Sequence, residues 1–145
     1  MADRREGEEA TAGGHLVLFD ALQGEVTRLA EAARDYLAAE RDDTVSGDPV
    51  RHLIATCEAT RLVSRLGYCI AWLLARRAVQ SGEIAPGAAA AVGGLGRLGG
   101  REVCLTEPSP GDGGTAELPY GLAELLERSA VLYRRVERLD RALDG

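Results

Sequence analysis

The sequence predicts an all-α protein that folds as an antiparallel three-helix bundle, and three observations support this fold class. Hydrophobic side chains recur with helical spacing in three separate segments, and no segment shows the alternation typical of a β-strand. The chain is 46% hydrophobic but only 4% aromatic, a balance that suits helices packed through aliphatic side chains. Its 145 residues suffice for one domain with a single core.

The first element is expected to be a helix from Leu16 to about Arg41. Its hydrophobic positions are three and four residues apart, so they share one face. They are Phe19, Leu22, Val26, Leu29, Ala33 and Tyr36. Residues 1–15 are polar and charged and contain a Gly-Gly pair, which predicts a disordered lead-in. Residues 16–145 are then expected to form a single helical-bundle domain.

A second helix is predicted to begin at Asp48-Pro49 and to end at Ser81-Gly82. Asp accepts hydrogen bonds from the free amides of the first turn, Pro has no amide hydrogen to lose there, and Gly allows a left-handed cap. At about 100° per residue, the side chains of this helix form three faces. The first face is apolar and contains Leu62, Val63, Leu66, Cys69, Ile70, Leu73 and Leu74. It is expected to pack between the other two long helices.

The second face of this helix consists of small residues. Small side chains let two helix backbones approach closely, so this face predicts close packing against a further helix. A second copy of the protein, related by a two-fold axis, is the expected source of that helix, and packing within the chain is the alternative. The residues expected to form this homodimer or close-packing face are Thr60, Ser64, Gly67, Ala71, Ala75 and Ala78.

The third face combines arginine with aromatic residues, the types that dominate protein–protein hot spots. Two interpretations remain open: a partner-binding surface, or ion pairs within the chain between an arginine-bearing helix and two acidic neighbours. For the binding interpretation the candidate residues on this helix are Arg61, Arg65, Tyr68, Trp72, Arg76 and Arg77. The candidates on the last helix are Tyr133, Arg134, Arg135 and Arg138.

Residues 83–117 are expected to form a short irregular Ala/Gly-rich loop between the second and third long helices. The segment from Ala88 to Val92 favours a short helix, which glycines then interrupt. The run from Gly94 to Gly99 matches GxGxxG, but no strand precedes it, so it does not indicate dinucleotide binding. The last helix opens at Leu118-Pro119 and keeps heptad spacing to Leu143, which completes an up-down-up bundle.

Composition and charge exclude several classes of function. All 17 basic residues are arginine, so chemistry that needs a catalytic or Walker-type lysine is excluded. A net charge of −6 disfavours a broad nucleic-acid surface. Cys57, Cys69 and Cys104 show no CxxC spacing and lie apart from both histidines, so no metal site is expected. We expect no catalytic residue, no cofactor, no membrane span and no signal peptide, as in a cytoplasmic protein.

Two ordered blocks of the sequence resemble the regulator of CtrA degradation family. The first block comprises Glu58-Ala-Thr-Arg-Leu62, Arg65-Leu66, Ala71 to Val79 and Gly82-Glu83. The second comprises Leu118-Pro119, Leu122, Leu125, Ser129 and Leu132 to Asp140, with Arg97-Leu-Gly99 between the two blocks. The resemblance covers roughly residues 16–143.

This resemblance implies a dimeric three-helix bundle without enzymatic activity, in the cytoplasm of an alphaproteobacterium. Members of that family act as adaptors in regulated proteolysis. They dock on a ClpXP protease primed by a response-regulator-like partner and present cell-cycle regulators, such as a CtrA-like regulator, for degradation. The alternative is a small helical transcriptional regulator that contacts nucleic acid through its Arg-rich helix surfaces, although the acidic net charge argues against it.

Overall fold

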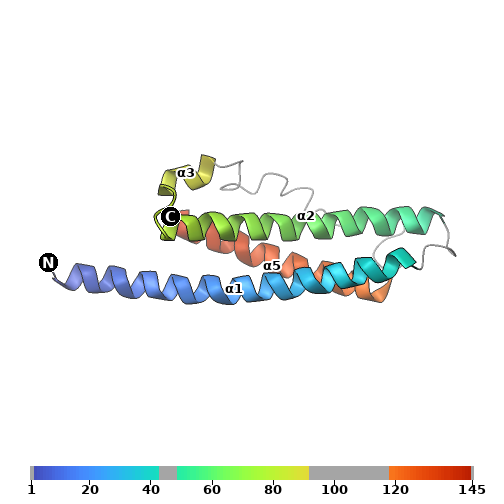
Figure 1. Ribbon diagram of the computed structural model, residues 1–145, viewed down its shortest axis with the longest axis horizontal. Helices are drawn as coiled ribbons and strands as arrows, with labels where there is room; N and C mark the ends of the chain where they lie inside the picture. The colour runs from blue at the N-terminus through green and yellow to red at the C-terminus, as the bar shows by residue number, and fades with distance from the viewer. Residues whose placement is uncertain (1, 43–48, 92–117, 145) are drawn as a thin grey trace.

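The computed structural model of the chain describes residues 2–42, 49–91 and 118–144. These ranges contain four helices: α1 (Ala2–Asp42), α2 (Pro49–Gln80), α3 (Pro86–Ala91) and α5 (Tyr120–Asp144). Figure 1 shows the three long helices lying side by side, with α3 beside the C-terminal end of α2. No strand occurs in the described ranges, so the prediction of an all-α protein is confirmed.

The order of helix directions differs from the prediction. Arg65 and Trp72 of α2 hydrogen-bond to Ser129 and Asp140 of α5, so residue numbers rise together along the two helices. Against α1 the numbers of α5 run in opposite directions, since Arg135 pairs with Glu25 while Gly121 lies against Tyr36. The helices α2 and α5 are therefore parallel, and both are antiparallel to α1 (Figure 1). The predicted antiparallel, up-down-up order is wrong, and the bundle is up-down-down.

The length of the connection between the helices permits this order. A tight turn after α2 forces the next helix to run back along it, but 39 residues separate Gln80 from Tyr120. The 32 residues of α2 span about 48 Å, whereas the connection without the six residues of α3 would reach roughly 110 Å if it were extended. The chain can thus return to the start of α2 before α5 begins, as in bundles with long crossover connections. The sequence predicts only a short irregular loop here. The GxGxxG run of this loop lies outside the described residues.

The helix α1 also begins earlier than predicted. It starts at Ala2, so a helix replaces the disordered lead-in expected over residues 1–15. The residues that suggested disorder are mainly Ala, Arg and Glu, which also have high helix propensity. An added Cβ at Gly7, Gly13 or Gly14 would meet nothing within 4 Å, so this part of α1 runs through open space.

The predicted C-terminal cap of α2 is confirmed. Gly82 has a φ of 78°, which places it in the left-handed region that glycine adopts without a steric penalty. The amide of Glu83 donates to the carbonyl of Ala78, and the amide of Gly82 donates to the carbonyl of Val79. These two bonds form a Schellman motif, which pairs carbonyls that the end of a helix leaves free.

The core lies along the axis where α1, α2 and α5 meet. The six predicted core positions of α1 are buried except Tyr36, which is half-buried. The rings of Phe19 and Trp72 pack edge to face, with their centroids 5.9 Å apart. The predicted heptad positions in the middle of α5 are buried, whereas Leu139 and Leu143 near its end, and Leu118 just before it, are partly buried.

Candidate functional site

Three residues of the arginine-aromatic face of α2 are directed toward α5 inside the bundle, namely Arg65, Trp72 and Arg76. Arg65 is 6% exposed, and its Nη1 donates to the carbonyl of Leu126 at 3.0 Å and to the hydroxyl of Ser129 at 3.2 Å. A buried guanidinium carries a large desolvation penalty, which these acceptors reduce. Arg65 therefore ties α2 to the middle of α5.

A second buried contact joins the same two helices near their C-terminal ends. Nε1 of Trp72 donates to Oδ1 of Asp140 at 2.8 Å, and Nη2 of Arg76 donates to the same oxygen at 2.8 Å. The guanidinium of Arg76 also lies 5.6 Å from the centre of the Trp72 ring, within the range of a cation–π interaction. One carboxylate thus satisfies an indole and a guanidinium that burial would otherwise penalise.

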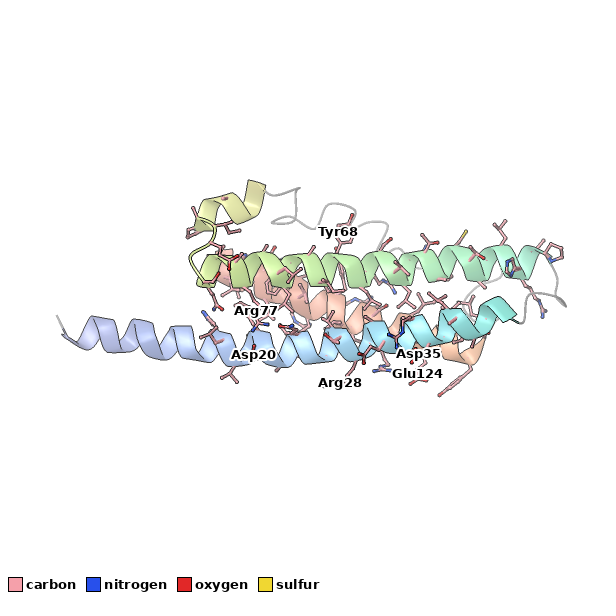
Figure 2. All side chains as sticks on the ribbon, viewed as in Figure 1. Asp20, Arg28, Asp35, Tyr68, Arg77 and Glu124 are labelled. Atoms are coloured by element: carbon pink, nitrogen blue, oxygen red, sulfur yellow. The ribbon has the colours of Figure 1, made fainter. Side chains whose placement is uncertain are left out.

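The other predicted arginines mostly form ion pairs within the chain. Arg61 lies 3.1 Å from Glu58 on its own helix, and Arg135 reaches Glu25 of α1 at 2.8 Å. Arg77 pairs with Asp20 of α1, and Figure 2 shows the two side chains directed toward each other across the α1/α2 boundary. The internal ion-pair interpretation therefore describes these residues.

The expected partner surface is not formed at three of its positions, because Arg65, Trp72 and Tyr133 are buried. Their hydrophobic area is buried between helices, and Arg65 and Trp72 also donate hydrogen bonds to α5, which the residue types alone did not reveal. Tyr68 is half-buried and points away from α1 in Figure 2, and Arg134 and Arg138 are exposed on α5.

The small-residue face of α2 lies on the outside of the bundle. Thr60 and Gly67 are exposed, and the other four positions are half-buried. A Cβ added at Gly67 would meet nothing within 4 Å, so no helix of the described ranges packs against this position. The expected close contact between helices is therefore not provided at Gly67 by α1, α3 or α5.

The exposed side chains of α2 between Leu53 and Leu74 share one property: none is charged. They are Leu53, Thr56, Cys57, Thr60, Val63, Gly67, Ile70 and Leu74, and we call them the α2 outer strip. The three charged residues in the same stretch are Glu58, Arg61 and Arg65, and each is buried or half-buried. Exposed charges are common on α1 and α5, so this part of α2 differs from them in having none. Depletion of charge is typical of the centre of protein–protein interfaces.

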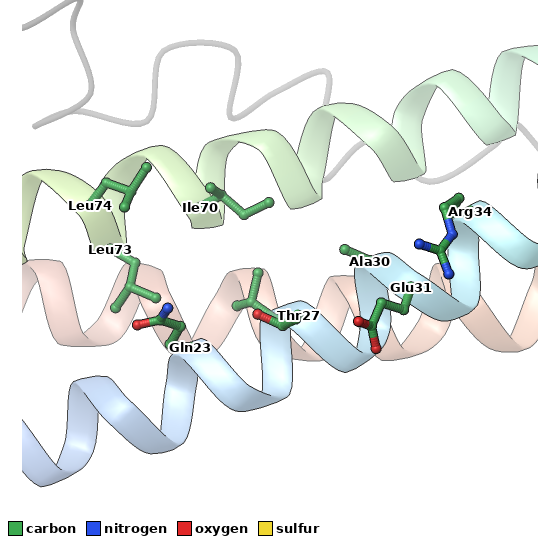
Figure 3. Close-up of a pocket in the computed structure, with 9 residues that line it drawn as sticks. Gln23, Thr27, Ala30, Glu31, Arg34, Ile70, Leu73 and Leu74 are labelled. Carbon is green, nitrogen blue, oxygen red and sulfur yellow. The ribbon is translucent and has the colours of Figure 1, made fainter.

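A groove between α1 and α2 borders the outer strip. It consists of two adjoining hollows of about 340 and 500 Å³, which share Ala30, Arg34 and Ile70 in their linings. Figure 3 shows the first hollow, where Ile70 and Leu74 of α2 lie opposite Thr27 and Ala30 of α1. The walls of both hollows are mostly apolar, so the groove suits hydrophobic side chains.

Within the described ranges no cluster of His, Cys, Asp and Glu is able to hold a metal ion. Cys57 is exposed and Cys69 is buried, while Cys104 lies outside the described residues. None of the helices in the described ranges has an apolar stretch sufficient to cross a membrane.

A family model described as a protein of unknown function, DUF1465, matches residues 14–145. The chain belongs to the DUF1465 family. The DUF1465 match includes all three long helices, except for the first turns of α1. No curated protein and no solved structure matches the chain.

The sequence analysis predicted neither the α1/α2 groove nor the absence of charge on the α2 outer strip. A signal for the strip was present, because all charged residues between Leu53 and Leu74 lie on the other side of a helical wheel. The groove had no such signal. It depends on how far apart α1 and α2 lie and on which helix covers which side.

Proposed function

We propose that this protein is a non-enzymatic adaptor in regulated proteolysis, which docks on a primed ClpXP protease and presents cell-cycle regulators for degradation. The observation that carries a protein-binding role is the α2 outer strip, an exposed surface without charge on a protein that is 28% charged. The protease pathway is supported by the sequence resemblance to the regulator of CtrA degradation family. The proposed partners are ClpXP, a response-regulator-like priming protein and a CtrA-like client, all in the cytoplasm.

A homodimer is part of this proposal. A two-fold axis brings like residues of two copies together, so any charge near the axis would face its own copy. The small-residue face carries no charge from Thr60 to Ala78, which removes this repulsion and permits close approach of two α2 helices. Sedimentation equilibrium of the purified chain tests this part, and a monomer across the whole concentration range would contradict it.

The adaptor role is tested with purified components. ClpXP, the priming partner and a CtrA-like client are combined with and without this chain, and client degradation is followed over time. We expect the chain to accelerate degradation and to crosslink to ClpX or to the receiver-domain partner when used as bait in native lysate. If degradation is unchanged and no protease component is recovered, the fold serves another purpose.

The substitutions Val63→Ser and Leu74→Ser, made together, test whether the outer strip takes part. Both side chains are more than half exposed, so their replacement leaves the core intact. Val131→Ser is the matched control, since Val131 is 58% exposed on α5, away from the strip. We expect the double variant to slow client degradation and the control to behave as wild type.

The alternative of a nucleic-acid regulator depends on the arginines of α5. Two of them are already paired with carboxylates, Arg135 with Glu25 and Arg141 with Glu137, which reduces the positive charge offered to phosphates. Filter binding to duplex DNA across a salt series separates the two functions, because phosphate contacts give a steep dependence on salt.

A further inference from the structure

The apolar face of α2 is wider than its neighbours cover. Leu62, Leu66 and Leu73 are at most 5% exposed, whereas Val63, Ile70 and Leu74 beside them are 53%, 38% and 59% exposed. The exposed three form one wall of the α1/α2 groove. In a four-helix bundle the side chains at such positions are covered by a fourth helix.

The size of the groove fits one helix. Val63 and Leu74 are eleven residues apart on α2, which corresponds to about 16 Å or three helical turns. The groove is bordered by Ala30, Ala33 and Ala38 of α1 and by Gly67 of α2, all of them short. Short residues permit an interaxial distance of about 8–10 Å, so a helix can rest on the groove without displacing α1 or α2.

Arg34 lines both hollows of the groove and is the one charged residue in the lining of the second, whereas the first is also lined by Glu31, so the charge that a partner meets is positive at the second hollow. Its ion pair is with Asp35, the next residue, and the two side chains are 72% and 69% exposed. Such an exposed pair contributes little free energy, so the guanidinium can exchange Asp35 for another carboxylate at small cost. The α2 side of the groove carries no charge. A matching helix therefore has an acidic residue on the flank that meets α1.

We propose that the α1/α2 groove binds an amphipathic helix of a partner protein, with apolar residues at positions i, i+4, i+7 and i+11 and a carboxylate facing Arg34. The inference rests on the proposed protein-binding function and specifies what one partner presents. A second copy of this chain fits the groove less well. A two-fold copy presents the same concave surface, and two concave surfaces leave unfilled space between them, whereas a helix is convex.

The test uses a synthetic probe. A fluorescein-labelled peptide of about 18 residues is designed as a helix with leucine at the four stated positions, alanine around them and glutamate on one flank. A second peptide has the same composition in an order that breaks the leucine stripe. Fluorescence anisotropy measures the binding of each peptide to the full chain and to its variants, with circular dichroism as a check on folding.

We expect saturable binding of the striped peptide to the wild type and to Val131→Ser. The combined Val63→Ser and Leu74→Ser variant should bind it at least about tenfold more weakly, since two desolvated apolar contacts are lost. The scrambled peptide should not bind. Arg34→Glu should weaken binding, and a striped peptide with arginine in place of glutamate should restore it.

Three results would overturn the proposal. The first is equal binding by the double variant and by the Val131→Ser control. The second is no saturable binding of the striped peptide to the wild type. The third is a wild-type dimer that the double variant converts to a monomer, because the groove then holds a second copy. If degradation of the client is still accelerated when the peptide fails to bind, the groove proposal fails while the adaptor function stands.

Discussion

At the scale of single residues, Asp140 of α5 organises the contact between α2 and α5. It accepts hydrogen bonds from Trp72 and Arg76, and only 8% of its surface is exposed. If a buried acceptor is removed, its donors stay buried but have neither water nor a hydrogen-bond partner. This costs more free energy than the loss of an exposed ion pair. The structural role of this aspartate follows from its two partners, which are more than 60 positions away in the sequence.

We predict that Asp140→Ala lowers the free energy of unfolding by about 2–4 kcal/mol. The matched control is Asp35→Ala, which removes an exposed ion pair with Arg34 and should change stability by less than about 0.5 kcal/mol. Urea denaturation measures both values. Trp72 is the only tryptophan of the chain, so its fluorescence also reports the altered contact. Equal effects of the two substitutions would contradict the buried role of Asp140.

Tyr36 of α1 gives the protein a dependence on alkaline pH. Burial, together with the charge and the hydrogen bonding of Glu40, raises the pKa of Tyr36 from 10.0 to about 12. The folded state therefore holds this proton more tightly than the unfolded state. The contribution to stability is complete below pH 10 and is lost as the pH rises through 12.

We predict a tyrosine that ionises late, followed by absorbance at 295 nm during an alkaline titration. Tyr36→Phe should remove the late step and should flatten the loss of stability between pH 10 and 12. Tyr120→Phe is the control, because Tyr120 is 84% exposed. An unchanged late step in Tyr36→Phe would assign it to another tyrosine.

At the scale of helices, the boundaries of α2 follow local chemistry. Pro49 stands at its first position and Gly82 closes it in a left-handed conformation, both as predicted. The end of α2 needs no tertiary contact, since the Schellman hydrogen bonds form within the segment from Ala78 to Glu83. Two glycines inside helices, in contrast, have opposite surroundings, and sequence alone does not distinguish them.

We predict opposite effects of the same substitution at Gly67 and Gly121. A Cβ at Gly67 meets nothing within 4 Å in the single chain, so Gly67→Ala should stabilise the monomer by about 0.5–1 kcal/mol through helix propensity. A Cβ at Gly121 would lie 2.9 Å from Cε2 of Tyr36, so Gly121→Ala should destabilise it by about 1–2 kcal/mol. Thermal unfolding of the two variants provides the comparison. Loss of stability at Gly67 would instead indicate that another helix packs tightly there, as the homodimer proposal requires in the assembled protein.

At the scale of the whole molecule, α1 extends beyond the core. Among the side chains of α1 that the structure describes, Phe19 is the first buried one, although the helix begins at Ala2. Cooperative unfolding depends on buried area, so the first turns of α1 add helix without adding much stability.

We predict that deletion of residues 2–12 shifts Tm by less than about 2 °C while it reduces the helical signal in circular dichroism. Deletion of residues 2–20 is the matched control. It removes Phe19 with its edge-to-face contact to Trp72, and should lower Tm by about 10 °C or more. A large loss from the shorter deletion would mean that the start of α1 is itself packed, for instance in an assembly.

The sequence by itself determined the all-α class, the limits of α2 and the core faces of α1 and α5, but only part of the core face of α2. These features depend on interactions between residues close in the chain, namely propensity, caps and spacing of three or four. It did not determine the start of α1, because Ala, Arg and Glu are compatible with both a disordered segment and a solvated helix.

Only the tertiary structure decided the direction of α5 and the roles of Arg65, Trp72 and Tyr133. A connection of 39 residues permits either direction, and the choice is made by contacts between distant residues such as Trp72 and Asp140. Arginine beside an aromatic ring suits a binding surface and an interior equally well, since both supply acceptors and exclude water. The α1/α2 groove is likewise decided only by the tertiary structure, because its width and its walls depend on how two helices lie side by side.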